Sequence, residues 1–235
     1  QTVEQLALAG VPLRIDPVLE PIGFGFAASL ARYQEVRRRF PDAEMMMGIG
    51  NLTELTDVDS AGVNVLLLAV CQELGIRSVL TTEVINWARS SVTECDIARR
   101  LVRYAVHHRR LPKHVETRLL TLRDEKLRTR GGEFLQQLAS EIKDSNLRIF
   151  AEDGMLHLVS AGLHLTDDDP FRLFEQLMAT APRNLDAGHA FYLGYELSKA
   201  VTALTLHKNY EQDESLDWGH LTVEENWHRL GRKRS

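Results

Sequence analysis

The chain has 235 residues, of which 44% are hydrophobic and 26% are charged, and its formal net charge is −5. This balance is typical of a globular protein with one large domain or two small ones, and the negative charge disfavours a general nucleic-acid binder. No apolar run approaches the roughly 20 residues that cross a membrane, and the first residues lack a signal-peptide pattern. The two cysteines lie in helix-like patterns, so we expect a cytoplasmic protein that contacts neither membrane nor nucleic acid.

The first half of the chain alternates apolar runs that favour strands with runs that favour helices. The expected strands span 13–16, 44–49 and 77–82, and the helices that follow them span 27–39, 60–74 and 92–108. Strands that alternate with helices are typical of parallel βα units. Because right-handed crossovers bring the carboxyl ends of such strands to one edge, we expect a ligand site there.

Capping residues set the limits of two of these helices. Asp59 or Ser60 is a natural N-cap for the helix over 60–74, and Gly75 follows its end. Ser91 and Glu94 have the spacing of a capping box at the start of the next helix. We therefore interpret Asp59 as a cap rather than as a catalytic residue.

The pattern changes after Pro112. We expect a domain over 1–125 and then a helical linker over 126–145, since residues 113–145 are charged and favour helix, loop and helix around Gly131-Gly132. From 146 to 235 we expect a small α+β domain with a polar tail. Its predicted elements are strands over 147–151 and 155–159, joined by the turn residues Asp153-Gly154, and helices over 170–179 and 187–206.

Asp16 is the first candidate ligand-binding residue. It ends the first expected strand, and Pro17 is followed by a loop in which Gly23 and Gly25 let the backbone approach a ligand closely. A carboxylate at this place can accept two hydrogen bonds from an amidine-like edge, such as that of a pterin or guanine ring. The alternative is an Asp that only caps the turn before Pro17.

Asn51 is the second candidate. It follows the second expected strand in the run Gly48-Ile49-Gly50-Asn51, where Gly50 lies in the same loop. An amide offers a ligand both a donor and an acceptor without adding charge. The alternative is that Asn51 merely takes a left-handed turn conformation.

A third loop follows the strand over 77–82 and carries Arg89, Ser90 and Ser91. An Arg beside a helix start can help to hold a phosphate, because the free N–H groups of the helix already point there. This single short stretch is the basis for a predicted phosphate site. No metal site is predicted, since the histidines between 107 and 114 lack a ligand context.

The helix expected over 187–206 carries His189, Tyr192, Glu196 and Lys199 on one face, at helical spacing. We interpret this stripe as solvated, with Glu196 and Lys199 paired.

The stretches Asp16–Phe26 and Met47–Leu55 resemble the pterin-binding superfamily of TIM barrels, which includes dihydropteroate synthases and folate- or corrinoid-linked methyltransferases. In the synthases a late strand reads Asp-Pro and then Gly-Phe-Gly, and its Asp binds the pterin; Asp16-Pro17 and Gly23-Phe24-Gly25 match it with a few extra residues between. In the methyltransferases the next strand ends in Gly-x-x-Asn, which Gly48-Ile49-Gly50-Asn51 matches. Synthases carry Ser-Arg-Lys at this place, and the absence of that Lys separates this chain from ordinary folate-type synthases.

Further matches cover most of the chain and resemble the dihydropteroate synthase-related proteins of archaea and methylotrophic bacteria, which are associated with tetrahydromethanopterin biosynthesis. They are Thr82-Glu83-Val84, Asp96–Arg100, Gly188–Glu196 and Tyr210–Asp213. The resemblance implies an α/β fold in which the three βα units are the last three of eight in a TIM-type barrel, followed by the small α+β domain. It also implies five further strands upstream of Gln1.

For function, the resemblance implies a synthase-like transferase that joins a pterin-methyl diphosphate to an arylamine, with Mg²⁺ entering through the diphosphate. The pterin contacts would come from Asp16, Asn51, Gly23, Gly25 and Gly50. We expect these 235 residues alone to be inactive, and the sequence leaves homo-oligomerization open. The alternatives are a pterin-dependent methyltransferase, which fits Asn51 better, and a non-catalytic pterin-binding or assembly subunit.

Overall fold

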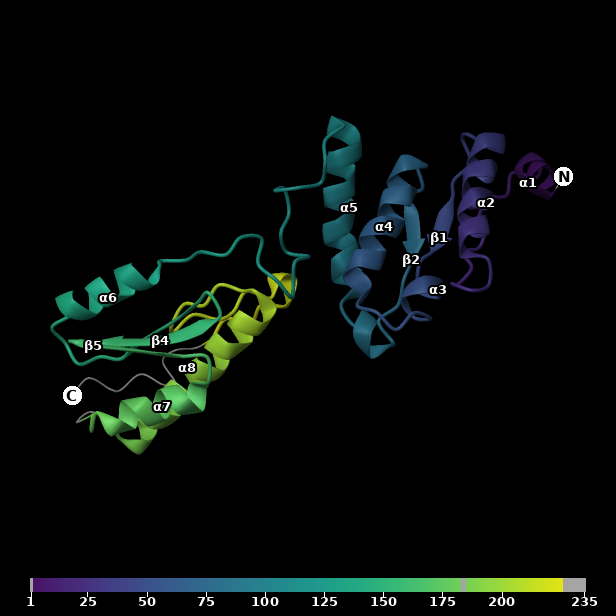
Figure 1. Ribbon diagram of the computed structural model, residues 1–235. Coiled ribbons are helices and arrows are strands. Elements are labelled where there is room, and N and C mark those ends of the chain that lie inside the picture. The colour runs from purple at the N-terminus through teal and green to yellow at the C-terminus, as the bar shows by residue number, and fades with distance from the viewer. Residues whose placement is uncertain (1, 183–184, 226–235) are drawn as a thin grey trace. The chain divides into compact units, whose positions relative to one another are not determined.

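The computed structural model of the protein describes residues 2–182 and 185–225, so most of the expected polar tail lies outside the described residues. The chain forms two compact units, Gln1–Leu119 and Leu120–Ser235, which we call unit 1 and unit 2 (Figure 1). Helices and small sheets occur in both units, which confirms the α/β class. In the described part of the chain, no helix is both long enough and apolar enough to cross a membrane.

Unit 1 contains the βα pattern that the sequence predicts. Its elements are α1 (Thr2–Leu8), α2 (Phe26–Arg39), β1 (Met46–Gly48), α3 (Gly50–Thr53), α4 (Ser60–Glu73), β2 (Ser78–Leu80), the 3-10 helix η1 (Asn86–Ala88) and α5 (Ser91–His108). The three long helices begin and end within one residue of their predicted limits. The strands are shorter than predicted, because regular pairing ends where the chain turns into the loops.

The sheet of unit 1 is parallel. Met46 pairs with Ser78 and Gly48 with Leu80 across β1 and β2. Ile15 forms an isolated parallel bridge to Met45, with its N–H 2.9 Å from the carbonyl oxygen of Glu44. Three consecutive chain segments therefore run in the same direction, and their carboxyl ends lie at one edge, as predicted.

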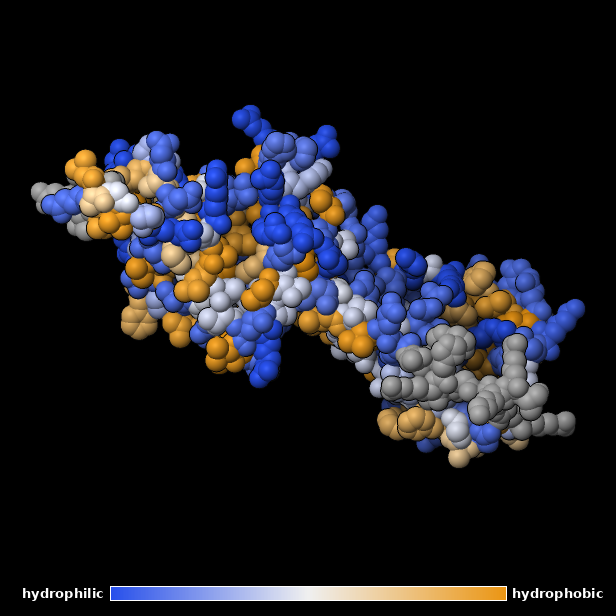
Figure 2. All heavy atoms as spheres, turned by 180° about the vertical axis from the view of Figure 1, so that it is seen from behind, coloured by the Kyte–Doolittle hydropathy of each residue, from blue (hydrophilic) through white to orange (hydrophobic). Residues whose placement is uncertain are grey.

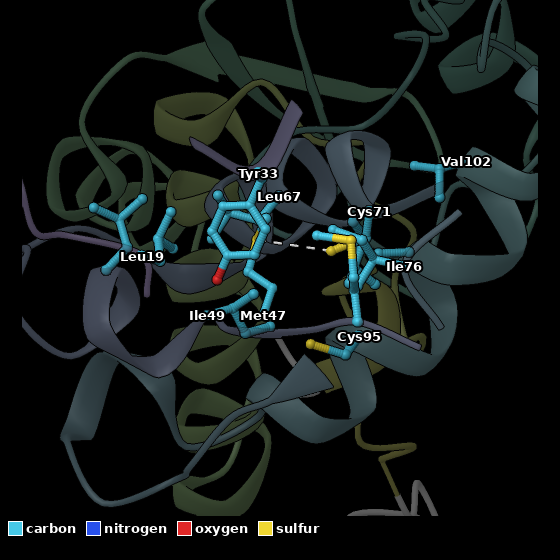
Figure 3. Close-up of a cluster of buried hydrophobic side chains, with 13 residues drawn as sticks. Leu19, Tyr33, Met47, Ile49, Leu67, Cys71, Ile76, Cys95 and Val102 are labelled. Carbon is cyan, nitrogen blue, oxygen red and sulfur yellow. Dashed lines mark hydrogen bonds between the residues drawn. The ribbon is translucent and has the colours of Figure 1, made fainter. Parts of the chain in front are cut away.

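A single apolar core joins this sheet to its helices. Its buried residues come from the first strand loop, α2, β1, α3, α4 and α5 (Figure 3): Leu19, Tyr33, Met45, Met47, Ile49, Leu52, Leu67, Leu68, Cys71, Ile76, Cys95, Ala98 and Val102. Full burial of one such side chain contributes about 1.5–3 kcal/mol. Core residues lie in β1 and on both sides of it in the sequence. The packing of the helices against this strand therefore positions the loops that follow the strands.

The predicted caps of unit 1 are confirmed only in part. Gly75 takes the left-handed conformation that ends α4, with φ of 65°. Asp59 occupies the N-cap position of α4, but its side chain makes no capping hydrogen bond. The capping box at Ser91 does not form, because Ser90 is the N-cap and the carboxylate of Glu94 accepts from the Ser90 hydroxyl instead.

Unit 2 is an antiparallel sheet with helices on both faces. Its elements are α6 (Gly132–Glu141), β3 (Arg148–Glu152), β4 (Met155–Ser160), β5 (Leu163–Asp167), α7 (Pro170–Ala179), α8 (Ala187–Leu206) and the 3-10 helix η2 (Gly219–Leu221). The strand order is β3-β4-β5. Asp153 and Gly154 both have positive φ, so the predicted hairpin turn is confirmed.

The two faces of this sheet are covered differently. Leu156 and Leu158 of β4 pack with Leu173 of α7 and with Leu193 and Leu197 of α8 in the larger core. Val159 packs with Leu135 and Ala139 of α6 on the other face. The alternation of apolar residues along β4 thus places neighbouring side chains in two separate cores.

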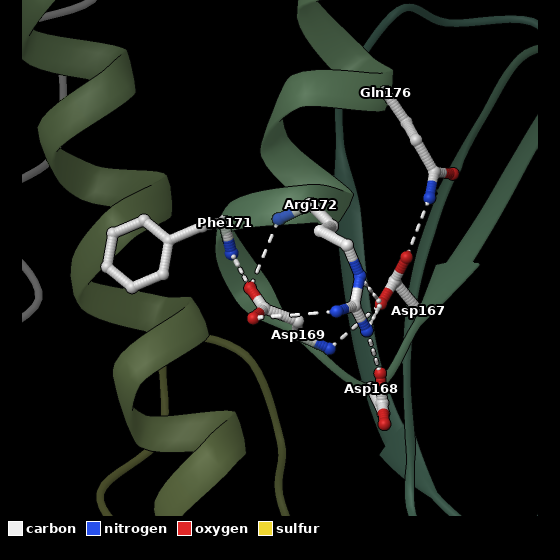
Figure 4. A network of polar contacts seen from close by, with 6 residues as sticks. All are labelled: Asp167, Asp168, Asp169, Phe171, Arg172 and Gln176. Carbon is white, nitrogen blue, oxygen red and sulfur yellow. Dashed lines mark hydrogen bonds and ion pairs between the residues drawn. The ribbon is translucent and has the colours of Figure 1, made fainter.

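An acidic cap holds the start of α7. The carboxylate of Asp169 accepts from the N–H groups of Phe171, at 2.7 Å, and Arg172, at 3.1 Å. The Arg172 guanidinium in turn contacts Asp167 at 2.8 Å, and it also contacts Asp168 (Figure 4). Asp169 is thus the N-cap of α7, and Pro170 occupies the first helical position, as is typical of helix starts.

Three expectations for the second half were wrong or incomplete. No helix forms over 113–131, and Val115, Leu120 and Leu122 stay exposed there, so a helix would have little apolar packing to stabilise it. The segment 126–145 is not a helical linker throughout: α6 begins only at Gly132 and packs against β4 and β5. The strand β5 was not predicted, although Leu163 to Asp167 alternate in the way that a half-buried strand requires.

Residues near the start of unit 2 are bonded to the segment that follows α8. The side chain of Asp124 accepts from the Asn209 amide at 2.7 Å and lies 3.4 Å from the fully buried ammonium of Lys208. The carbonyl oxygen of the Asn209 side chain accepts from the N–H of Arg128 at 2.8 Å. Residues 124–128 are therefore held by a segment that follows the last long helix.

Candidate functional site

Asp16 lies where the first parallel segment ends, and it is exposed. Its Oδ1 accepts from the N–H of Val18 at 2.9 Å and from the hydroxyl of Tyr33 at 2.7 Å. The first bond is the turn cap considered for this residue, so that interpretation is confirmed for one of the two carboxylate oxygens. Among the described residues no hydrogen-bond donor reaches Oδ2, which leaves one acceptor for a ligand.

The loop after Asp16 is held by an arginine from α2. The Arg32 guanidinium donates to the carbonyl oxygens of Pro17, at 3.1 Å, and Val18, at 2.7 Å. Val18 has φ of 67°, an uncommon conformation for a β-branched residue. The bonds from Arg32 and to Asp16 stabilise this turn and hence the place of the carboxylate.

Asn51 lies on α3, directly after β1, and its side chain is also exposed. It does not take the left-handed conformation considered as the alternative, since it is a helical residue. Its amide nitrogen donates to the carbonyl oxygen of Leu19 at 3.0 Å. The second N–H of the amide and its Oδ1 remain for a ligand.

The side chains of Asp16 and Asn51 both lie close to Gly48. A Cβ atom placed on Gly48 would lie 3.8 Å from Oδ2 of Asp16 and 3.8 Å from the amide nitrogen of Asn51. Both side chains therefore lie within contact distance of one glycine at the carboxyl end of β1. A free carboxylate oxygen and an amide at this spacing can together bind a flat ligand edge that presents N–H donors.

The three predicted loop glycines have different structural roles. Gly23 and Gly25 have φ of 86° and 106°, so they give the loop before α2 a conformation that other residues rarely adopt. Gly50 lies against the end of β2, where an added Cβ would be 3.9 Å from the backbone nitrogen of Thr82 and 3.2 Å from the Glu54 carboxylate. Their contact with a pterin stays a prediction.

The predicted phosphate site carries two carboxylates. The Ser90 hydroxyl donates to Glu94 at 2.7 Å, and the N–H of Val92 donates to Glu83 at 3.0 Å. Ser91 is buried, with its hydroxyl 2.8 Å from that of Thr81. Arg89 is exposed beside them. The phosphate assignment stays a prediction, and the negative charge at this helix start disfavours it.

Glu94 belongs to a buried polar cluster between α4 and α5. Its Oε2 accepts from the Ser60 hydroxyl at 2.6 Å and from the Asn64 amide at 2.8 Å. Glu94 is 4% exposed, and all of these donors are neutral. The cluster fastens the two helices together, which explains why Glu94 is unavailable as a helix cap.

Two residues near the strand ends were missed by the sequence analysis. Tyr33 bonds to Asp16 as described, but 17 residues separate them and no local pattern joins them. Glu54 accepts from the hydroxyl of Thr82, so it lies at the carboxyl end of β2. Its position three residues after Asn51 could have suggested a second acidic group at this edge. In the described part of the chain, no group of three metal-binding side chains occurs.

One relative is found by comparison with curated proteins. The chain is 28% identical to an uncharacterized protein of Methanocaldococcus jannaschii over 92% of its own length. It spans only 45% of that relative, so the relative is about twice as long as the matched region. No protein-family model matches the chain, and no solved structure matches it.

The polar stripe on α8 of unit 2 was expected to face solvent, but two of its side chains are buried. Glu196 is 1% exposed, and its carboxylate accepts from the hydroxyl of Tyr210 at 2.7 Å. The predicted pairing is confirmed, because the ammonium of Lys199 lies 2.9 Å from Glu196. Tyr192 donates to Asp213, and His189 stacks on the Tyr192 ring. The segment after α8 covers this face, which a helical spacing alone does not reveal.

Exposed apolar side chains accompany the strand-end loops of unit 1. They include Ile22, Phe24, Leu55 and Val84. Figure 2 shows apolar side chains exposed on one face of this unit.

Proposed function

We propose that the chain is part of a pterin-binding protein of the dihydropteroate-synthase type, with unit 1 as the C-terminal part of a TIM-type barrel. The observation that supports this best is that the side chains of Asp16 and Asn51 both lie next to Gly48, at the carboxyl end of β1. In the proposed reaction, a pterin-methyl diphosphate condenses with an arylamine in tetrahydromethanopterin biosynthesis. The rest of the barrel would lie in the portion of a longer protein that corresponds to the unmatched part of the M. jannaschii relative.

The chemistry of the pair suits a pterin edge. A pyrimidinone ring with an amino substituent presents adjacent N–H donors, one of which can reach Oδ2 of Asp16. A hydrogen bond to an ionised carboxylate is roughly twice as strong as one between neutral groups. The Asn51 amide adds an acceptor and a donor beside it. These residues bind and orient the ligand, and none of them is assigned a proton-transfer step.

We propose no binding site for Mg²⁺ on this chain. The described residues contain no group of three ligands for a metal, and the carboxylates Glu83 and Glu94 are both engaged in hydrogen bonds at the start of α5. No step is therefore assigned to a metal ion.

A pterin-dependent methyltransferase is the second candidate, and the start of α5 favours it. A methyl transfer needs no diphosphate site, and the hydroxyls of Ser90 and Ser91 are already bonded within the protein. If pyrophosphate competes with a dihydropterin diphosphate for the full-length protein, the synthase is favoured. If added pyrophosphate leaves the affinity for the dihydropterin diphosphate unchanged, the methyltransferase is favoured. A non-catalytic pterin-binding subunit is favoured if Asp16→Ala still supports the pathway in cells.

The test of the pterin site is a titration of the full-length native protein with a dihydropterin diphosphate, with and without Asp16→Asn. We expect binding by the wild type and a loss of about a hundredfold in the variant, because the substitution removes the charged acceptor. No binding by the wild type would refute the proposed function. Equal binding by both proteins would refute the role of Asp16.

A further inference from the structure

Tyr33 is the one core side chain of α2 that reaches the candidate site. Its ring is fully buried beside Leu19 and Ile49 in the core of unit 1 (Figure 3). Its hydroxyl emerges at the edge of that core and donates to Oδ1 of Asp16 at 2.7 Å. A rigid, buried residue is thus bonded to an exposed carboxylate.

The phenol of Tyr33 keeps its proton and acts as the donor in its bond to Asp16. Burial, and then the hydrogen bond to Asp16, raise the pKa of Tyr33 far above its ordinary range, so its proton stays in place. A buried hydroxyl without a partner would carry a desolvation cost, and the carboxylate of Asp16 removes it. Rotation of the carboxylate would weaken this bond together with the bond from the N–H of Val18.

The two donors on Oδ1 therefore fix the direction of Oδ2. With Oδ1 held by Tyr33 and Val18, Oδ2 stays beside Gly48 and the Asn51 amide. We infer that Tyr33 is a positioning residue, which orients Asp16 so that its single free carboxylate oxygen selects the 2-amino N–H donor of the ligand. This inference rests on the proposed function, because it specifies how the same site recognises its pterin.

A purely structural role for Tyr33 predicts a different outcome. If the hydroxyl serves only to satisfy its own burial, its loss weakens every ligand by the same factor. If it orients Asp16, its loss reduces the ability of the site to discriminate between ligands. The ratio of two affinities separates these roles, whereas either affinity alone does not.

The experiment compares a dihydropterin with its analogue that lacks the 2-amino group, for the full-length protein and for Tyr33→Phe. Tyr104→Phe is the matched control, because Tyr104 is a half-buried tyrosine on α5 of the same unit. We expect Tyr33→Phe to weaken dihydropterin binding by about tenfold and to shrink the ratio between the two ligands, while Tyr104→Phe leaves both unchanged. An unchanged ratio in Tyr33→Phe overturns the inference and leaves the proposed function standing. Failure of the wild type to bind either ligand overturns both.

A second measurement covers the case in which Tyr33→Phe does not fold. Tyrosines carrying ¹³C at Cζ are followed by NMR during the dihydropterin titration. We expect one tyrosine resonance to move on binding, and the same resonance to be displaced in Asp16→Asn without ligand. If no tyrosine resonance responds to both changes, the phenol is not coupled to the site and the inference is wrong.

Discussion

The carboxylate of Glu196 and the ammonium of Lys199 form an ion pair of 2.9 Å on α8, and both side chains are almost completely buried. Burial alone would lower the pKa of Lys199, but its hydrogen bonds to Glu196 and Glu225 raise that pKa overall. Lys199 is therefore charged in the folded protein, and Tyr210 and the carbonyl oxygen of Glu214 add further hydrogen bonds to the pair.

Breaking this pair is expected to destabilise unit 2 strongly. Lys199→Met leaves the carboxylate of Glu196 buried without its counter-ion. We expect the free energy of unfolding to fall by about 3–5 kcal/mol, the usual cost of such a change. The measurement is urea unfolding followed by circular dichroism. Arg38→Met is the control, because Arg38 is exposed on α2 and its ion pair with Glu35 is screened by solvent, so its loss should leave the stability nearly unchanged. Equal losses in the two variants would contradict the prediction.

His157 makes the stability of unit 2 depend on pH. Burial and then the neighbouring His164 lower the pKa of His157 below the ordinary value of 6.5. The unfolded chain then binds more protons, so the free energy of unfolding falls as the pH drops below about 6.5. The carboxylates Glu35 and Glu116, each with a pKa near 2, titrate well below this window.

The check is the unfolding free energy measured between about pH 5 and pH 8 for the wild type and His157→Gln. We expect a flatter profile in His157→Gln. His107→Gln, at an exposed site on α5, should keep the wild-type slope. A slope that survives in His157→Gln would assign the pH dependence to another group.

Gly48→Ala is expected to separate binding from stability. The new methyl group would lie in ordinary contact, 3.8 Å from both Asp16 and Asn51, so the unfolding free energy should change by less than about 1 kcal/mol. The same methyl group would contact both polar side chains of the proposed pterin site, and dihydropterin affinity should fall by at least about tenfold. Gly62→Ala, at an exposed position on α4, is the control and should bind normally. Normal binding by Gly48→Ala would place the ligand elsewhere.

The two thiols report the unfolding of unit 1. Burial raises the pKa of Cys71 to about 12, and burial with the charge of Glu94 raises that of Cys95 to about 11. Because the thiolate is the reactive form, neither cysteine should react with a disulfide reagent in the folded protein at mildly alkaline pH. Both should react in concentrated guanidinium chloride. Labelling of the folded protein faster than its unfolding would show that the core is open.

The sequence predicted those parts of the fold whose signals are local. Helix α8 was predicted because its apolar residues recur at helical spacing. The meeting of Asp16 and Asn51 followed from a topological rule, since parallel strands place their carboxyl ends at one edge. The burial of Glu196 was missed because it depends on a segment that returns from after the helix, and helical spacing carries no information on what covers a face.

The other errors have equally specific causes. The helix expected within 113–131 was inferred from charged residues, which are compatible with a helix but do not drive its packing. Strand β5 follows β4 after only Ala161 and Gly162. Its alternation was overlooked because the hairpin signal at Asp153-Gly154, between β3 and β4, is stronger. Tyr33 could not be connected with Asp16, because the pairing is made through the packing of α2 against the sheet.

The bonds between Asp124 and Asn209 also constrain the order in which unit 2 can form. They join residues 85 positions apart, and the buried ammonium of Lys208 lies between them and the segment near Asp217. A nascent chain presents Asp124 long before its partners leave the ribosome. Unit 2 therefore cannot complete its fold during synthesis until α8 and the residues after it have emerged, and a ribosome stalled at Leu206 would expose an incomplete domain to chaperones and proteases.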